Sequence, residues 1–445
     1  MSFNIGLSGL YAANKSLDVT GNNIANVATT GFKQSRIEFA DQYAQSIRGT
    51  SGGTSIGSGV TTAAVSQQFA QGGLTTGTGN SLDLAINGNG FFMLSNSGET
   101  LYTRAGAFRT DKDGFVVNSA GMNLQGYNVD ANGNVAVGVS GNLRVDSSNQ
   151  AANPTSIITN VANLNSTSTV PTITPFDATN TNSYNFTYST KVFDSQGNEH
   201  SLETYLAKTG TNTWAMYSLI DGRSISNPAS TTADRNNLTF DTSGNMVINT
   251  SATPSVPSAS TNVAVNADGT FQVNNWVPAM QTGTGTSATW VANGAVGVTS
   301  GIRLDMTQAT QTASVSGPIT QTQNGYAAGQ IKDMSVDASG NLFASYTNGQ
   351  SKVIGQVSLT TFANVQGLSP AGGTNWRETF ASGLPVTGVP QSGTLGYITG
   401  QALEDSNVDL TLELVNLIKA QSNYQANAKT ISTESTIMQT TIQMT

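Results

Sequence analysis

Residues 401–445 read QALEDSNVDLTLELVNLIKAQSNYQANAKTISTESTIMQTTIQMT and contain neither glycine nor proline. The chain of 445 residues has 47 glycines, so their absence here is local and favours a long helix. Ser406 or Asn407 is a suitable N-terminal cap, because a short polar side chain accepts hydrogen bonds from the first free N–H groups. Asp409 and Glu413 then place negative charge near the positive end of the helix dipole.

One face of this expected helix carries a stripe whose spacing alternates between four and three residues. This spacing is the heptad pattern of a coiled-coil seam. The stripe consists of Leu410, Leu414, Leu417, Gln421, Tyr424, Ala428, Ile431, Ser435, Met438 and Ile442. We therefore expect the helix to pack against other helices along this seam.

The N-terminus repeats the pattern over a shorter run. Its stripe consists of Phe3, Leu7, Leu10, Asn14, Leu17, Gly21, Ile24 and Ala28. Five apolar side chains bury too little surface to offset the conformational entropy lost when a helix of this length becomes ordered, so one such helix is not stable by itself. We expect the two terminal helices to pair, to stay labile in a free subunit, and to become ordered against other copies of the chain.

Between the ends, the chain predicts strands broken by turns. Short apolar runs mark the strands at 82–86, 91–94, 115–117, 184–193, 202–206, 214–220, 331–336, 342–346 and 353–362. At seven places between the expected strands, an Asp or Asn that precedes a Gly by three residues favours a type I turn that ends in a left-handed glycine. These turns are 87–90, 111–114, 118–121, 130–133, 194–197, 241–244 and 337–340.

The strand and turn pattern that precedes residue 145 returns after about residue 318, which indicates nested domains. The expected fold is mainly β with several domains and coiled-coil helical termini that pair. We expect a terminal helical assembly domain at 1–30 and 401–445, an extended connector at 31–71, an inner β domain at 72–145 and 318–400, and one or more inserted outer β domains at 146–317.

The composition excludes several classes of protein. Only 10% of residues are charged and the net charge is −8 without a cluster of Lys or Arg, so a nucleic-acid partner is not expected. The chain has no cysteine and one histidine, which excludes disulfides, thiol catalysis and multi-histidine zinc sites. The sequence has no apolar run of 18 residues, so we expect no helix that spans a membrane. The N-terminal residues lack the pattern of a cleaved signal peptide.

Candidate catalytic and ligand motifs are weak. His200 ends the polar turn DSQGNEH at 194–200, which predicts a surface histidine and no catalytic triad. The loop at 88–90 lacks a third glycine, and no Gly-Lys pair provides a phosphate loop. The turns at 111–114 and 130–133 lack the later glutamate of a calcium loop. We therefore expect no catalytic residue, cofactor or metal.

Several motifs together resemble the axial proteins of the bacterial flagellum, the family of rod and hook subunits. The N-terminal motif is LSGL at 7–10 followed by DVTGNNIANVATTGFK at 18–33, and the C-terminal motif lies in 406–428, with Ser422 where the family commonly has arginine. NGNGFF at 87–92 and YTRAGAF at 102–108 are similar to the inner-domain motif. Rod subunits with these motifs are short, so the insert at 146–317 favours a hook subunit.

The resemblance implies a structural subunit, not an enzyme, that polymerises into the flagellar hook. This tube is a flexible universal joint that transmits torque to the filament, and terminal helices surround its central export channel. The subunit would be extracellular, exported without a cleaved signal peptide, and in contact with its own copies, the hook cap protein, the distal rod and the hook–filament junction proteins. The residues expected in subunit assembly are Phe3, Leu7, Leu10, Leu17, Asn22, Asn23, Ile24, Asn26, Leu410, Leu414, Leu417, Gln421, Tyr424, Ala428, Ile431, Met438 and Ile442.

The sequence also allows two functions other than that of a hook subunit. A distal rod protein would form a straight, stiff tube instead of a curved one. A secreted β-rich protein that binds or cleaves glycans would be monomeric and would tolerate loss of both terminal helices.

Overall fold

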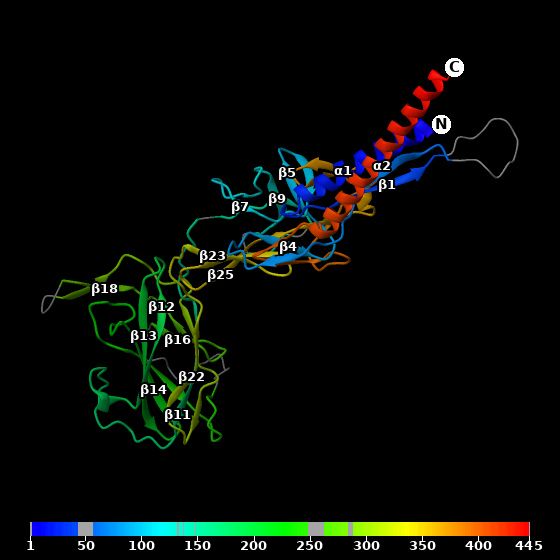
Figure 1. The fold of residues 1–445 in the computed structure, drawn as a ribbon. Helices are drawn as coiled ribbons and strands as arrows, with labels where there is room; N and C mark the ends of the chain where they lie inside the picture. Colours follow the sequence, from blue (N-terminus) through cyan, green and yellow to red (C-terminus); the bar gives the residue numbers. More distant parts are fainter. Residues whose placement is uncertain are drawn as a thin grey trace. The chain divides into compact units, whose positions relative to one another are not determined.

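The computed structural model describes residues 2–42, 57–130, 133–136, 138–146, 148–247, 262–283 and 288–444 (Figure 1). The chain forms two compact units. The terminal unit comprises Met1–Ser147, Ile331–Ser345 and Ser351–Thr445, and the inserted unit comprises Ser148–Gln330 and Tyr346–Gln350. Part of the expected connector, residues 43–56, lies outside the described residues.

The terminal unit contains both long helices, α1 (Ser2–Ala25) and α2 (Leu410–Gln443). Its strands in the first part of the chain are β1 (Ser35–Asp41), β2 (Val60–Gln67), β3 (Leu74–Thr76), β4 (Leu84–Asn87), β5 (Phe91–Asn96), β6 (Glu99–Thr103), β7 (Arg109–Thr110), β8 (Val116–Val117), β9 (Asn123–Asn128) and β10 (Gly141–Asn142). Its later strands are β23 (Ile331–Val336), β24 (Asn341–Tyr346), β25 (Ser351–Val357), β26 (Leu359–Thr361), β27 (Ser369–Gly372), β28 (Asn375–Arg377), β29 (Val386–Gly388), β30 (Tyr397–Gly400) and β31 (Ala402–Glu404).

Strands from both ends of the chain pair throughout the terminal unit. The main path of its largest sheet runs β23-β24-β25-β9-β5-β6-β28-β27. Strand β3 pairs with β31 and β4 pairs with β30, both antiparallel. A buried aromatic cluster fills one part of this core, with the rings of Tyr102 and Phe362 at 4.7 Å and Trp376 beside them. The predicted mainly β fold, with an inner part built from both halves of the chain, is confirmed.

The two helices pair, as predicted, and run side by side in blue and red in Figure 1. Small residues make their closest approach. A Cβ atom on Gly9 would lie 2.5 Å from Asn427 Oδ1, and one on Gly6 would lie 3.1 Å from Ile431 Cγ1. Ala13 in α1 and Ala420 in α2 are also buried. At their closest approach, α1 therefore presents glycines to the larger side chains of Asn427 and Ile431 in α2.

The start of α2 differs from the prediction. Asp409, rather than Ser406 or Asn407, is the N-cap, and its Oδ1 accepts hydrogen bonds from the N–H groups of Thr411 at 2.9 Å and Leu412 at 3.1 Å. Asn407 is unable to cap the helix because its side chain bonds to backbone groups of other segments. The prediction of the cap was therefore wrong, by two residues for Asn407 and by three for Ser406.

Six of the seven predicted turns have the expected geometry. In each, the glycine N–H donates to the carbonyl of the Asp or Asn three residues earlier, and the glycine has a φ between 77° and 85°. The six turns end at Gly114, Gly121, Gly133, Gly197, Gly244 and Gly340. The remaining turn, 87–90, differs because Asn87 ends β4 and both Gly88 and Gly90 have positive φ.

The inserted unit is built from strands. They are β11 (Ile157–Asn165), β12 (Phe186–Phe193), β13 (Glu199–Gly210), β14 (Thr213–Ile220), β15 (Asp234–Thr239), β16 (Val263–Val265), β17 (Phe271–Val273), β18 (Ala279–Thr282), β19 (Thr289–Ala292), β20 (Ile302–Asp305), β21 (Thr310–Thr312) and β22 (Gly317–Gln323). One sheet has the order β12-β13-β14-β15, and a second has the order β16-β17-β20-β11-β21 with β22 beside β11. Trp214, Met216, Phe271 and Leu304 belong to one apolar core that both sheets share.

The inserted unit extends further along the chain than the boundary expected at residue 318. Strand β22 pairs antiparallel with β11, from Ile158 opposite Gln323 to Asn163 opposite Gly317. The division between the units falls instead between Gln330 and Ile331. Residues 318–330 therefore lie with the inserted unit because their strand extends its sheet.

Candidate assembly site

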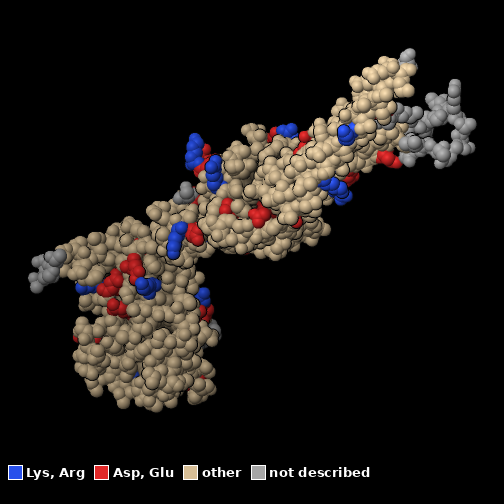
Figure 2. All heavy atoms as spheres, in the orientation of Figure 1, with Lys and Arg blue, Asp and Glu red and all other residues tan. Residues whose placement is uncertain are grey.

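The helix pair leaves much of its apolar surface exposed. Within α2, Ile418 is 63% exposed and Ile442 is 73% exposed, although both are large apolar side chains. A monomeric protein rarely exposes a long apolar strip, so such a strip indicates a contact with another surface. Figure 2 shows few charged side chains along the visible face of the helices, and the end of α2 after Glu434 carries none.

The predicted assembly residues fall into three groups. The exposed ones are Phe3, Asn22, Leu410, Leu414, Gln421, Tyr424, Met438 and Ile442. The half-buried ones are Leu7, Leu10, Leu17, Ile24, Asn26, Leu417, Ala428 and Ile431. Asn23 alone among them is buried. The predicted residues are thus partly exposed and partly covered, and one of the half-buried ones, Ile431, lies against Gly6 in the contact between the helices.

The sequence pattern missed further exposed apolar residues on α2. These are Leu412, Val415, Ile418 and Ile437. They lie off the heptad stripe, so a search restricted to one seam does not find them. Counting all apolar residues around α2 would have indicated a helix with more than one apolar face.

Asn23 connects the end of α1 to the first strand. Its side chain accepts a hydrogen bond from the Ser35 N–H at 2.9 Å and donates one to the Ser35 carbonyl at 2.9 Å. The amide therefore pairs with β1 in the way that a neighbouring strand would. Within a single chain, this side chain positions α1 rather than facing outward.

A buried cluster of three charges lies where the N- and C-terminal segments meet the strands. Lys33 Nζ is 2.5 Å from Glu404 Oε1, and Arg104 Nη1 is 3.1 Å from Glu404 Oε2. Lys33 also donates to the Ala70 carbonyl, and Arg104 donates to the carbonyl of Gly88. No local pattern in the sequence indicates this cluster, because its members are far apart along the chain.

Burial controls the ionisation of the two cations in this cluster. Removal from water lowers the pKa of Lys33, and the nearby Glu404 carboxylate opposes that effect only in part. The pKa of Arg104 is lowered for the same reason, again against the effect of Glu404. One carboxylate thus serves two buried cations, so its loss would be costly.

Asn407 strengthens the place where the N- and C-terminal segments meet the strands. Its Oδ1 accepts from the Gln34 N–H at 2.8 Å, and its Nδ2 donates to the carbonyls of Gln68 at 2.7 Å and Ala70 at 3.1 Å. The segment just before α2 is therefore bonded both to the chain after α1 and to the chain after β2. Together with Glu404, this residue fixes where both helices leave the strands.

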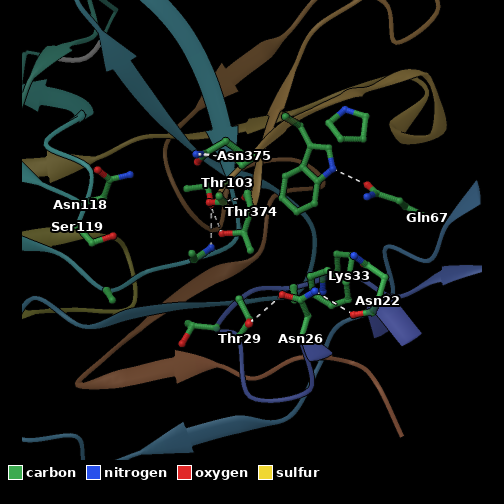
Figure 3. Close-up of a pocket in the computed structure, with 18 residues that line it drawn as sticks. Asn22, Asn26, Thr29, Lys33, Gln67, Thr103, Asn118, Ser119, Thr374 and Asn375 are labelled. Atoms are coloured by element: carbon green, nitrogen blue, oxygen red, sulfur yellow. Dashed lines mark hydrogen bonds between the residues drawn. The ribbon is translucent and has the colours of Figure 1, made fainter. Parts of the chain in front are cut away.

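A groove of about 680 Å³ lies beside the end of α1 (Figure 3). Asn22 and Asn26, two of the predicted assembly residues, line one side of it. On another side, Trp376 Nε1 donates to Gln67 Oε1 at 2.5 Å. Lys33 is the charged side chain among the lining residues, and its ammonium group is paired with Glu404. The groove is therefore suited to neutral, polar contacts.

The prediction of a surface position for His200 was wrong. The side chain is buried, with 5% of the residue exposed, and its ring lies between the carboxylates of Asp194 and Asp221. The polar turn is covered by residues that follow it by more than seventy positions, including Trp276, whose ring meets the histidine ring edge-on at 5.3 Å. Local polarity alone could not indicate this cover.

The described part of the chain contains no group of three or more His, Cys, Asp or Glu side chains arranged to hold a metal ion. Among the same residues, no helix combines the length and apolar character needed to cross a membrane.

Four family models match successive parts of the chain. They are described as Flagella basal body rod protein (residues 3–33), Flagellar hook protein FlgE/F/G D1 domain (85–160), Flagellar basal body protein FlaE D2 domain (163–326) and Flagellar basal body rod FlgEFG protein C-terminal (399–444). The first and last cover most of α1 and all of α2, and the FlaE D2 model lies within the inserted unit.

Similar proteins match over the full length. The flagellar hook protein FlgE of Escherichia coli (strain K12) is 37% identical over 449 residues, which is 100% of both chains. The flagellar hook protein FlgE of Salmonella typhimurium is 37% identical over 452 residues, again 100% of both. The crystal structure of Helicobacter pylori flagellar hook protein FlgE2 aligns with 75% of this chain and 100% of its own, with 13% identity and a TM-score of 0.46. The full-length identity to the first two relatives shows that the chain belongs to the flagellar hook protein FlgE family.

Proposed function

We propose that this chain, a structural subunit of the flagellar hook by its family, polymerises with its own copies through the exposed apolar faces of α1 and α2. The observation that carries the proposal is the exposure of large apolar side chains along α2, including Leu414, Ile418 and Ile442. Burying such side chains is worth about 1.5–3 kcal/mol each, so contact between several copies would stabilise the helices strongly. The role is structural, and no catalytic residue is assigned.

In the assembled hook, the helix pair would lie at the inside of a tube, around a central channel. The strands of the terminal unit would form the wall, and the inserted unit would face outward. The buried cluster of Lys33, Arg104 and Glu404 supports this arrangement, because it holds the base of both helices firmly to the strands. A helix whose base is fixed can transmit force to the wall.

The low charge of the chain suits a tube that bends while it turns. Charged residues make up 10% of the sequence, so contacts between outer surfaces would consist mostly of hydroxyl and amide groups and water. Such contacts can exchange partners as the spacing between subunits changes, without breaking ion pairs. We further propose the hook cap protein, the distal rod and the hook–filament junction proteins as partners, and export without a cleaved signal peptide.

The experiment compares full-length wild-type protein with Ile418→Glu and Ile442→Glu. The matched control is Val139→Glu, because Val139 is an exposed apolar residue of the terminal unit outside the helices. Sedimentation and electron microscopy would follow assembly in rising ammonium sulfate, which strengthens apolar burial. Tubes from the wild type and the control, with soluble monomers from the two helix variants, would support the proposal.

Tubes formed by Ile418→Glu and Ile442→Glu at the same salt concentration as the wild type would overturn it. Substitutions are preferable to removing residues 401–445, because that truncation also removes Glu404. The loss of Glu404 would leave two buried cations unpaired and would confuse misfolding with loss of assembly.

A further inference from the structure

His200 is held between two carboxylates inside the inserted unit. Its Nδ1 lies 2.6 Å from Asp221 Oδ2 and its Nε2 lies 3.3 Å from Asp194 Oδ2. An ionised carboxylate only accepts hydrogen bonds, so both contacts are satisfied only when both ring nitrogens carry protons. The geometry is therefore that of an imidazolium, the charged form of histidine.

The same site holds both ends of the hairpin formed by β18 and β19. Trp276, shortly before β18, packs edge-on against the His200 ring. Asn293, directly after β19, donates from Nδ2 to Asp194 Oδ2 at 2.8 Å, the same oxygen that faces His200. The chain that follows Asn293 is bonded to the turn that follows Asp194, since the Ser195 N–H donates to the Val296 carbonyl at 2.9 Å. The Asn293–Asp194 hydrogen bond therefore links the hairpin to the carboxylate that faces His200, and the Arg223 guanidinium, 5.1 Å from the centre of the Trp290 ring in β19, is a further contact of the hairpin.

The charges around His200 are few. Asp194 and Asp221 are the charged groups that contact its ring among the described residues. On the neighbouring positions of β12 and β13, Lys191 and Glu199 pair with each other at 2.8 Å and are largely exposed. Asn198 and Asn293, which also bond to Asp194, are neutral.

Burial and the two carboxylates act in opposite directions on His200. Removal from water lowers the pKa of the ring, but the hydrogen bonds and charges of Asp221 and then Asp194 outweigh it, so the pKa is raised above the usual value. Because the pKa is raised in the folded chain, the protonated ring stabilises the folded state. This stabilisation is fully present below the ordinary histidine pKa of about 6.5. It is lost as the pH rises through the raised value.

We propose that His200 is a pH-sensitive clamp that holds β18 and β19 onto the inserted unit while its ring is protonated. On loss of a proton to solvent, the ring keeps one N–H. The shorter contact to Asp221 retains it, so Nε2 then presents a lone pair to the Asp194 carboxylate. Two acceptors repel at this distance, Asp194 turns away, and the bond to Asn293 is weakened with it.

The test uses the full-length chain, in which His200 is the single histidine, so its ring signals are unambiguous in NMR. Carbon-13-labelled histidine gives the midpoint of the ring titration between pH 5 and 9. Hydrogen exchange followed by mass spectrometry, corrected for the intrinsic effect of pH on exchange, gives the protection of β18 and β19 over the same range. We expect protection to fall at least about tenfold, with a midpoint that coincides with the ring titration and lies above about 6.5.

The variant His200→Gln should remove this pH dependence, and Lys191→Gln, on the exposed ion pair nearby, should retain it. Protection that stays constant while the ring titrates would overturn the proposal, as would a ring midpoint at or below about 6.5. If His200→Gln does not fold, the comparison of the two wild-type curves still decides the question.

Discussion

Lys33 and Glu404 lie 371 positions apart in the chain, yet Lys33 Nζ and Glu404 Oε1 are 2.5 Å apart and both side chains are fully buried. This contact joins the segment after α1 to the segment before α2. Arg104 brings the strands of the terminal unit into the same contact. The junction therefore requires three distant parts of the chain to be in place together.

Glu404→Gln should destabilise the terminal unit by about 3–5 kcal/mol, because it leaves two buried cations without a counter-charge. Urea unfolding followed by circular dichroism would measure the loss. The control is Arg377→Gln, which breaks the exposed pair with Glu99 at 2.7 Å and should cost at most about 1 kcal/mol. Equal effects of the two substitutions would show that the buried cluster contributes no more than a surface pair.

The small residues at the helix contact give a second prediction. Gly9→Leu should weaken the pairing of α1 with α2, because a Cβ atom there already approaches Asn427 Oδ1 to 2.5 Å. Gly21→Ala should stabilise α1 by about 0.5–1 kcal/mol, because a Cβ atom there would meet no neighbouring atom within 4 Å and alanine favours a helix. Thermal melting of the helical circular dichroism signal would compare them. A Gly9→Leu melting temperature at or above that of Gly21→Ala would contradict the observed contact.

Alkaline pH should destabilise the inserted unit through Tyr188. Burial raises the pKa of Tyr188 to about 12, whereas an unfolded tyrosine ionises near 10. The unfolded chain therefore loses its proton first, so stability is unaffected below about pH 9 and falls between about pH 10 and 12. Denaturant unfolding across this range would show the slope.

Tyr188→Phe should reduce that slope without abolishing it, since it removes one ionising group while Tyr205 of the same unit, whose pKa is also raised by burial, remains. The same substitution at Tyr11, which is 65% exposed on α1, is the matched control and should leave the slope unchanged. If the slope of stability against pH is unchanged in Tyr188→Phe, residues other than Tyr188 cause the loss of stability at alkaline pH.

Local patterns in the sequence predicted both helices and several of the turns between strands. Six of the seven turns between an Asp or Asn and a glycine formed, because the information for such a turn lies within a few residues. The heptad spacing likewise found both helices. It could not show which face is used within one chain, because that choice depends on Gly6 and Gly9 meeting α2 closely.

The wrong predictions for His200 and for the cap of α2 share one cause, which is contact between distant segments. His200 has polar neighbours in sequence, but Trp276 and Asn293 cover its turn from more than seventy positions away. Asn407 has the chemistry of a helix cap, but it bonds to Gln34 and Gln68 instead, so Asp409 caps α2. Such competition cannot be seen in a local window.

In a tube made from copies of this chain, α1 and α2 should form the inner surface. The most direct measurement is a helical reconstruction by electron cryomicroscopy of tubes assembled from the full-length protein. Density for both helices should surround a central channel, with the strands of the terminal unit outside them and the inserted unit at the largest radius. Helix density at the outer surface of the tube, or an inserted unit that lines the channel, would contradict this arrangement.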